Sequence, residues 1–139
     1  MRALLKKLYL YCESIPDRFY PFTSEIEGRL VRGRESYKQA VENAFAKYGP
    51  NSLGLKLQFY RGACHFIGSV LFIVFATLIS QKLFGSEVAL YVLLGAAIVA
   101  LFVQEFFSHP YRFQQSRRKG IVDWLTWVIP MVLYVIFWL

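Results

Sequence analysis

The chain has 139 residues, of which 56% are hydrophobic and 18% aromatic, and its formal net charge is +7. Three apolar runs fill more than a third of this length, which argues against an ordinary soluble domain and favours a membrane protein. A basic chain can also bind nucleic acid, but these cations flank the apolar runs as membrane topology requires, so we expect no nucleic-acid partner.

A short amphipathic helix is predicted at the start of the chain. Apolar residues recur at helical spacing from Leu4 to Ile15, and the basic residues fall largely on the opposite side. This pattern is typical of a helix that lies in the membrane interface with its lysines toward lipid headgroups. We expect Pro16 to end this helix and residues 17–22 to form an aromatic connector.

A second helical pattern begins at about Ser24, which is a candidate N-cap. Gly28 and Gly33 weaken its first half. This leaves two interpretations open: one long amphipathic helix, or a loose basic segment followed by a firmer helix from about Glu35. The sequence Gly-Pro-Asn at 49–51 predicts the end of the helix in either case.

The three apolar runs are each about 20 residues long and cover residues 63–83, 88–107 and 121–139. A helix rises about 1.5 Å per residue, so about 20 residues cross roughly 30 Å of hydrocarbon. The sequence therefore predicts an all-α membrane protein with three transmembrane helices, preceded by one or two amphipathic inner-face helices. Residues 1–61 are expected to form the amphipathic, basic segment, and residues 62–139 the transmembrane domain.

The basic residues predict the orientation in the membrane. Apart from Lys82, all of the 16 Lys and Arg lie in residues 1–61 or 104–123. These two segments share a side in a three-span protein, and basic residues stay preferentially on the cytoplasmic side. We therefore expect the N-terminus inside and the C-terminus outside, in a mitochondrial inner membrane or a bacterial plasma membrane.

Four ionisable side chains are predicted to share one layer near the inner headgroups: His65, Glu105, His109 and Asp123. His109 follows Glu105 by four residues, so the two share a face if the helix continues. The four could pair with the basic loop and hold helix ends, act as acid–base groups, or ligate a divalent ion. They are scattered over three helices and no zinc-type Cys/His pattern is present, so we expect no metal and no cofactor.

Basic side chains near the inner face are candidate contacts for anionic lipid phosphates. They are Arg112, Arg117, Arg118 and Lys119 in the loop after the second span, together with Arg29, Arg32 and Arg34 in the N-terminal segment. In the second span Ala96 and Ala100 form a small-xxx-small pair, which lets two helix backbones approach closely. We expect this pair to mediate helix packing.

The amphipathic start, the three spans and Glu105 at the inner end of the second span resemble the small prokaryotic diacylglycerol and undecaprenol kinases in topology. The motif of that family is Glu-x-x-Asn-(Ser/Thr)-Ala-x-Glu, followed later by Lys-Asp. Here Ser108 and Arg112 stand where the motif has Asn and the second Glu, and the Lys-Asp pair is missing. The resemblance is therefore one of topology only, without the carboxylates that bind magnesium nucleotide.

These features favour a small non-catalytic accessory or scaffold subunit of a larger membrane complex. Three short-looped spans enclose little interior, and the segment before them is long enough to dock other membrane subunits or anionic phospholipid at the inner face. The alternative is an interfacial enzyme that modifies lipid headgroups with Glu105, His109, Asp123 and His65. A channel is disfavoured, because the polar residues of the spans are too sparse to line a pore.

Overall fold

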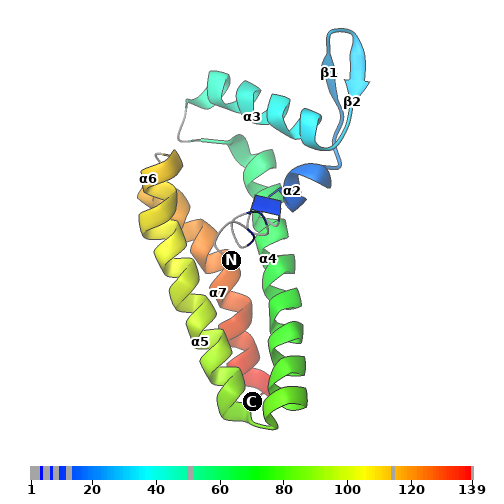
Figure 1. Ribbon diagram of the computed structural model, residues 1–139. Coiled ribbons are helices and arrows are strands. Elements are labelled where there is room, and N and C mark those ends of the chain that lie inside the picture. Colours follow the sequence, from blue (N-terminus) through cyan, green and yellow to red (C-terminus); the bar gives the residue numbers. More distant parts are fainter. Residues whose placement is uncertain are drawn as a thin grey trace. The chain divides into compact units, whose positions relative to one another are not determined.

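The computed structural model describes Leu4, Lys7, Leu10, Tyr11 and residues 14–49, 52–113 and 115–138, with the backbone alone for 112 and 113. Half of the amphipathic helix expected over residues 4–15 therefore lies outside the described residues, and Leu4, Lys7, Leu10 and Tyr11 are helical. The chain divides into two compact units, Met1–Arg61 and Gly62–Leu139. Most of the described residues are helical, and the elements are labelled in Figure 1.

The first unit contains the short helix α2 (Ile15–Arg18), the strands β1 (Ser24–Ile26) and β2 (Arg29–Val31), helix α3 (Arg34–Tyr48) and the beginning of helix α4 (Gly54–Ile79). The second unit contains the rest of α4, the π-helical turn η1 (Ser80–Phe84), helix α5 (Glu87–Val103), the π-helical turn η2 (Gln104–Ser108), helix α6 (His109–Phe113) and helix α7 (Arg117–Trp138).

A β-hairpin replaces the first half of the second predicted helix. Strands β1 and β2 pair in antiparallel register, with Ile26 opposite Arg29. The two residues between them, Glu27 and Gly28, have φ angles of 51° and 74°. Positive φ at both positions is the signature of a two-residue hairpin turn and cannot occur inside a right-handed helix. Of the two interpretations left open, one long helix was wrong, and a helix from about Glu35 agrees with α3, which begins at Arg34.

Two predicted helix ends are also corrected. Ser24 does not cap a helix; it lies in β1, and its hydroxyl is 2.9 Å from the hydroxyl of Ser36. Pro16 does not end a helix but lies in the first turn of α2, where the missing N–H of proline costs no hydrogen bond. The stop predicted at 49–51 agrees with the last helical residue of α3, Tyr48.

The first unit folds around a small core of its own. Tyr20, Ala44, Leu53 and Leu57 are buried together. The ring of Tyr20 makes edge-on contacts with three other aromatic rings, with centroid distances of 5.1–5.4 Å: those of Phe22, Tyr37 and Tyr60. Burial, and then the nearby Tyr37, raise the pKa of Tyr20 above its usual value of 10.0. Part of the N-terminal segment is therefore a packed module.

Three helices are long and apolar enough to cross a membrane: Gly54–Phe84, Glu87–Tyr111 and Arg117–Trp138. The three runs predicted from the sequence map onto these helices, which confirms a mostly helical fold with three helices long and apolar enough to span a membrane. The first helix is longer than its predicted span, since it begins at Gly54 in the first unit. A chain with three such helices is compatible with a multi-pass membrane protein.

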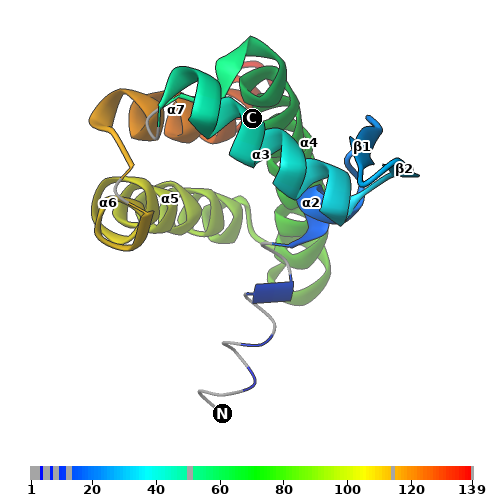
Figure 2. The same ribbon diagram turned by 90° about the horizontal axis from the view of Figure 1, so that it is seen from above.

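In the second unit α4, α5 and α7 run side by side (Figures 1 and 2). Their shared core contains Ile73 and Ala76 from α4, Leu90 and Leu94 from α5, and Met131 from α7. Hydrogen bonds also link the helices. Ser69, which is fully buried, donates a 2.6 Å bond to the carbonyl of Trp127, and the indole N–H of Trp124 donates to the carbonyl of Ile98.

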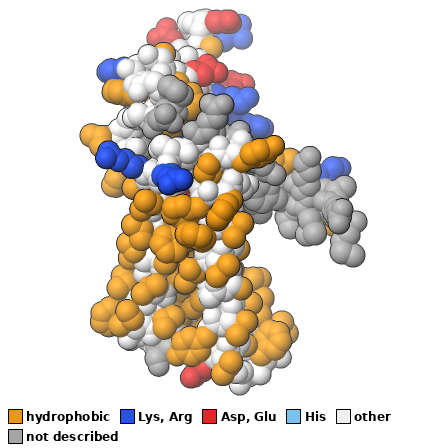
Figure 3. Space-filling model, turned by 90° about the vertical axis from the view of Figure 1, so that its left-hand side faces the viewer, with side chains coloured by type: hydrophobic (Ala, Val, Ile, Leu, Met, Phe, Trp, Pro, Cys, Tyr) orange, Lys and Arg blue, Asp and Glu red, His pale blue; other side chains and the backbone are white. Residues whose placement is uncertain are grey.

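The outer surface of these helices is strongly apolar. In the most apolar window of each span only 17%, 11% and 22% of residues, in chain order, are buried. Figure 3 shows hydrophobic side chains covering the flank of the helices. In water so large an apolar surface is unfavourable, whereas lipid chains or neighbouring apolar subunits can cover it.

Candidate functional site

The π-helical turn η2 brings three polar side chains together at the end of α5. A π-helical turn is rare and often occurs at functional sites, because it shifts the positions that follow it around the helix axis. Here both Gln104 and Glu105 contact His109. The Nε2 atoms of Gln104 and His109 are 3.3 Å apart, and Nδ1 of His109 is 3.0 Å from Oε2 of Glu105. His109 is thus held from two sides.

Glu105 is the most enclosed of the ionisable groups predicted to form a site, with 2% of its surface exposed. The side-chain amide of Gln115 donates a 2.8 Å hydrogen bond to its Oε2 atom. Gly120 of α7 lies against the backbone at the same place, since a Cβ there would be 3.0 Å from the carbonyl oxygen of Glu105. The carboxylate therefore has two side-chain contacts and sits where α7 approaches η2.

A second pair joins α4 to α7. Nδ1 of His65 is 3.9 Å from Oδ1 of Asp123, and 7% of the surface of Asp123 is exposed. The hydroxyl of Thr126 lies 3.4 Å from Nδ1 of His65 and donates to the backbone carbonyl of Asp123 at 2.7 Å. The ring of Trp127 is 5.7 Å from the ring of His65. This pair is bounded by polar and aromatic groups of α7.

The structure thus arranges the four predicted residues as two carboxylate–imidazole pairs. Such a pair can exchange a proton, which is the chemistry of a general acid or base. Access is the obstacle, because Glu105 and His109 are 2% and 7% exposed.

Within the described ranges, no group of three or more His, Cys, Asp and Glu is placed to hold a metal ion. Gln104, Gln115 and Thr126 were not anticipated, because amide and hydroxyl side chains carry no spacing signal.

The cations expected to contact lipid occur in both units. Arg117 and Arg118 are exposed in the first turn of α7, and Lys119 is half-buried. These cations lie at the N-terminal end of the helix, where the helix dipole disfavours positive charge. The turn contains no acidic residue that would offset this. Arg29, Arg32 and Arg34 are exposed in the first unit, whereas the side chain of Arg112 lies outside the described residues.

Ala96 and Ala100 are exposed on α5. The core contacts of α5 are made by other residues, among them Leu90 and Leu94. A small-xxx-small pair on an outward face can only mediate close packing with a helix from outside the chain. The predicted packing role therefore does not apply to the interior of this bundle.

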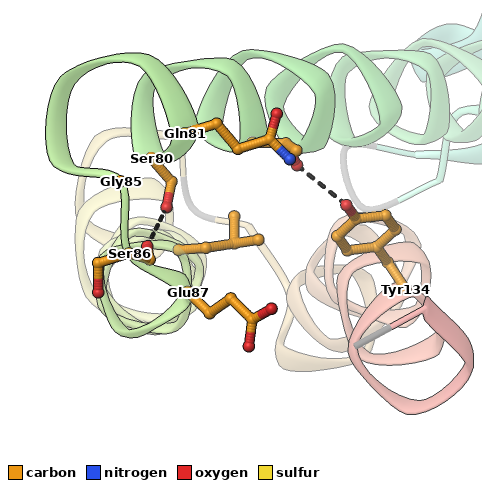
Figure 4. A pocket seen from close by; sticks show the side chains of 8 residues that line it. Ser80, Gln81, Gly85, Ser86, Glu87 and Tyr134 are labelled. Carbon is orange, nitrogen blue, oxygen red and sulfur yellow. Dashed lines mark hydrogen bonds between the residues drawn. The ribbon is translucent and has the colours of Figure 1, made fainter.

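A pocket of about 270 Å³ lies where η1 leads into α5. Figure 4 shows its wall. It is lined by Thr77, Ser80, Gln81, Gly85, Ser86, Glu87, Leu90 and Tyr134. The sequence showed here only a short polar connection between two spans, and Tyr134 is about 50 residues away along the chain. No local pattern could have joined these residues into one site.

No family model, curated protein or solved structure matches the chain.

Proposed function

We propose that the protein is a small non-catalytic accessory or scaffold subunit of a larger membrane complex. The observation that carries the proposal is the enclosure of Glu105. Its carboxylate contacts His109 and Gln115, and 2% of its surface is exposed. A catalytic carboxylate must reach its substrate, whereas a carboxylate that holds a helix end needs only its internal partners.

The apolar surface supports the same proposal. The spans bury few of their residues within the chain, and α5 buries the fewest. The exposed Ala96 and Ala100 offer a face on which a partner helix could approach closely. A scaffold subunit needs such outward faces, since its partners rather than an enclosed cavity complete its structure.

We further propose that the N-terminus lies inside and the C-terminus outside, in an inner membrane of the bacterial or mitochondrial type. The distribution of Lys and Arg supports this orientation. Anionic phospholipid is the proposed lipid partner at the inner face. Arg117 and Arg118 favour it, because a phosphate at the start of α7 would meet both guanidinium groups and the positive end of the helix dipole.

The test is the native mass of the protein and what co-purifies with it after extraction in mild detergent. The proposal predicts a particle well above the 16.2 kDa protomer, with other subunits present. Ala96→Phe should release these subunits, because the larger side chain prevents close approach on α5. Val74→Phe, on the exposed face of α4, is the matched control. A lone protomer for the wild-type protein contradicts the proposal.

The alternative function is an interfacial enzyme that acts on lipid headgroups. The two carboxylate–imidazole pairs favour it, since proton transfer at a headgroup needs such groups. Overexpression in the native host should then change the headgroup composition of the membrane, and Glu105→Gln and His109→Ala should abolish the change while the protein stays folded. Equal lipid composition with the wild type and both variants would remove the alternative.

A further inference from the structure

The pocket beside η1 is independent of the paired carboxylates and of the proposed scaffold role. Three helices contribute to it: Thr77 belongs to α4, Leu90 to α5 and Tyr134 to α7. Two hydrogen bonds hold its walls. The hydroxyls of Thr77 and Tyr134 are 3.1 Å apart, and the hydroxyl of Ser80 donates to the carbonyl of Ser86. The pocket is therefore built by tertiary contacts.

The lining of the pocket is rich in groups that accept hydrogen bonds. Hydroxyl oxygens, the Gln81 amide oxygen and the Glu87 carboxylate can all accept. Figure 4 shows Glu87 extending from α5 toward α7, and Gln81 of η1 on the wall beside the hydrogen bond that joins Thr77 to Tyr134. Glu87 is the only charged residue among the eight that line the pocket. The full negative charge of this carboxylate outweighs the partial positive charge of about half a unit at the start of α5, so the site attracts a cation that donates several hydrogen bonds.

The chemical class of the ligand follows from this lining. A single carboxylate is a poor site for a divalent metal, which takes six or more oxygen ligands. A quaternary ammonium has no N–H to donate and is usually bound by an aromatic cage. A primary ammonium carries three donors and one positive charge, which suits one carboxylate surrounded by hydroxyl and amide oxygens.

We propose that this pocket binds a primary ammonium group, with Glu87 as its counter-ion and Tyr134 and Gln81 as further hydrogen-bond partners. The pocket volume of about 270 Å³ is below the range of about 300–1,000 Å³ typical for drug-sized ligands, so it suits a headgroup rather than a large cofactor. The ammonium can belong to an aminophospholipid or to a free amine. Leu90 provides apolar contact for the carbon chain next to the nitrogen.

The experiment compares lipids that differ only in the ammonium group. Purified full-length protein in detergent receives equimolar phosphatidylethanolamine and phosphatidylcholine with the same acyl chains, and native mass spectrometry measures which lipid is retained. In a second arm ethanolamine or choline is added alone and the thermal midpoint is recorded. We expect about tenfold preferential retention of the ethanolamine lipid, the scale of a charge-assisted hydrogen bond.

Glu87→Gln removes the charge with little change in shape and should abolish the preference. Tyr134→Phe should lower it severalfold. Glu25→Gln removes an exposed carboxylate in β1 and is the matched control. Stabilisation by ethanolamine but not choline would support a free amine as ligand, and a response to the lipid alone would support a lipid headgroup. Equal retention of both lipids without an ethanolamine effect, or a preference unchanged in Glu87→Gln, would overturn the proposal.

Discussion

Gly68 of α4 lies directly against the indole ring of Trp127 of α7, so closely that a Cβ at position 68 would overlap the ring. The next residue, Ser69, donates a hydrogen bond to the carbonyl of the same tryptophan. Two consecutive residues of α4 thus receive the side chain and the backbone of one residue of α7. Small residues play this role in membrane helices because they let backbones come close.

Gly68→Ala should destabilise the bundle by about 1–3 kcal/mol, the usual cost of adding a group to a packed interior. The Trp127 ring must move to make room, so the thermal midpoint in detergent should fall and tryptophan fluorescence should shift. Gly62→Ala is the control on the same helix, because its Cβ would meet Thr126 at an ordinary 3.8 Å. Equal midpoints for the two variants would contradict the close packing of Gly68 against Trp127.

Ser69→Ala should cost about 0.6–1.7 kcal/mol, which runs from the average to the maximum contribution of a hydrogen bond between membrane helices. Unfolding in a denaturing detergent would measure the loss. Ser86→Ala is a suitable comparison, since the Ser86 side chain makes no capping hydrogen bond; if it is equally harmful, the bond to Trp127 contributes nothing specific.

A double-mutant cycle between Glu105 and His109 should show a coupling energy of about 0.5–2 kcal/mol, because the side chains touch at 3.0 Å in a buried place. The variants are Glu105→Gln, His109→Ala and the combination, with unfolding free energies measured in detergent. A cycle between Glu105 and the exposed Tyr111 serves as the reference and should give a value near zero. Additive effects of Glu105 and His109 would show that their contact is not stabilising.

Gly28→Val should open the hairpin, since a β-branched residue at φ 74° is strained by at least about 1 kcal/mol. Hydrogen exchange of the amides in residues 24–31 would report the loss of protection. Gly28→Asn should retain it, because asparagine tolerates the left-handed conformation. Unchanged protection in the valine variant would mean that residues 24–31 do not form this turn.

Tyr20 predicts how the first unit responds to alkaline pH. Its pKa in the folded state is raised above 10.0 by burial and then by Tyr37, so the unfolded chain ionises first. The contribution of the un-ionised Tyr20 to the stability of the folded state is fully present below about pH 10. It is lost as the pH rises through the pKa that Tyr20 has in the folded state. Tyr20→Phe should therefore lose less stability than wild type as the pH rises above about 10, as followed by near-ultraviolet circular dichroism. Tyr48→Phe, an exposed position, should decline as wild type does.

The hairpin shows why part of the fold escaped prediction. Its two strands have three residues each, which is too short for an alternating pattern to stand out from a helical one. The local signal was Gly28, which was recognised as unfavourable in a helix but not as half of a two-residue turn. A glycine at this position is compatible both with a weakened helix and with a two-residue hairpin turn. Only the pairing of β1 with β2 distinguishes the two structures.

The sequence by itself determined the three long helices, because a run of about 20 apolar residues can be recognised from consecutive residues without knowledge of tertiary contacts. It also placed Glu105 and His109 four residues apart. The tertiary structure alone decided that Gln115 donates to Glu105, that Ser69 donates to the carbonyl of Trp127 and that Tyr134 and Glu87 line one pocket. Those contacts join residues that are distant along the chain, and their distances depend on how the helices pack, which local periodicity does not encode.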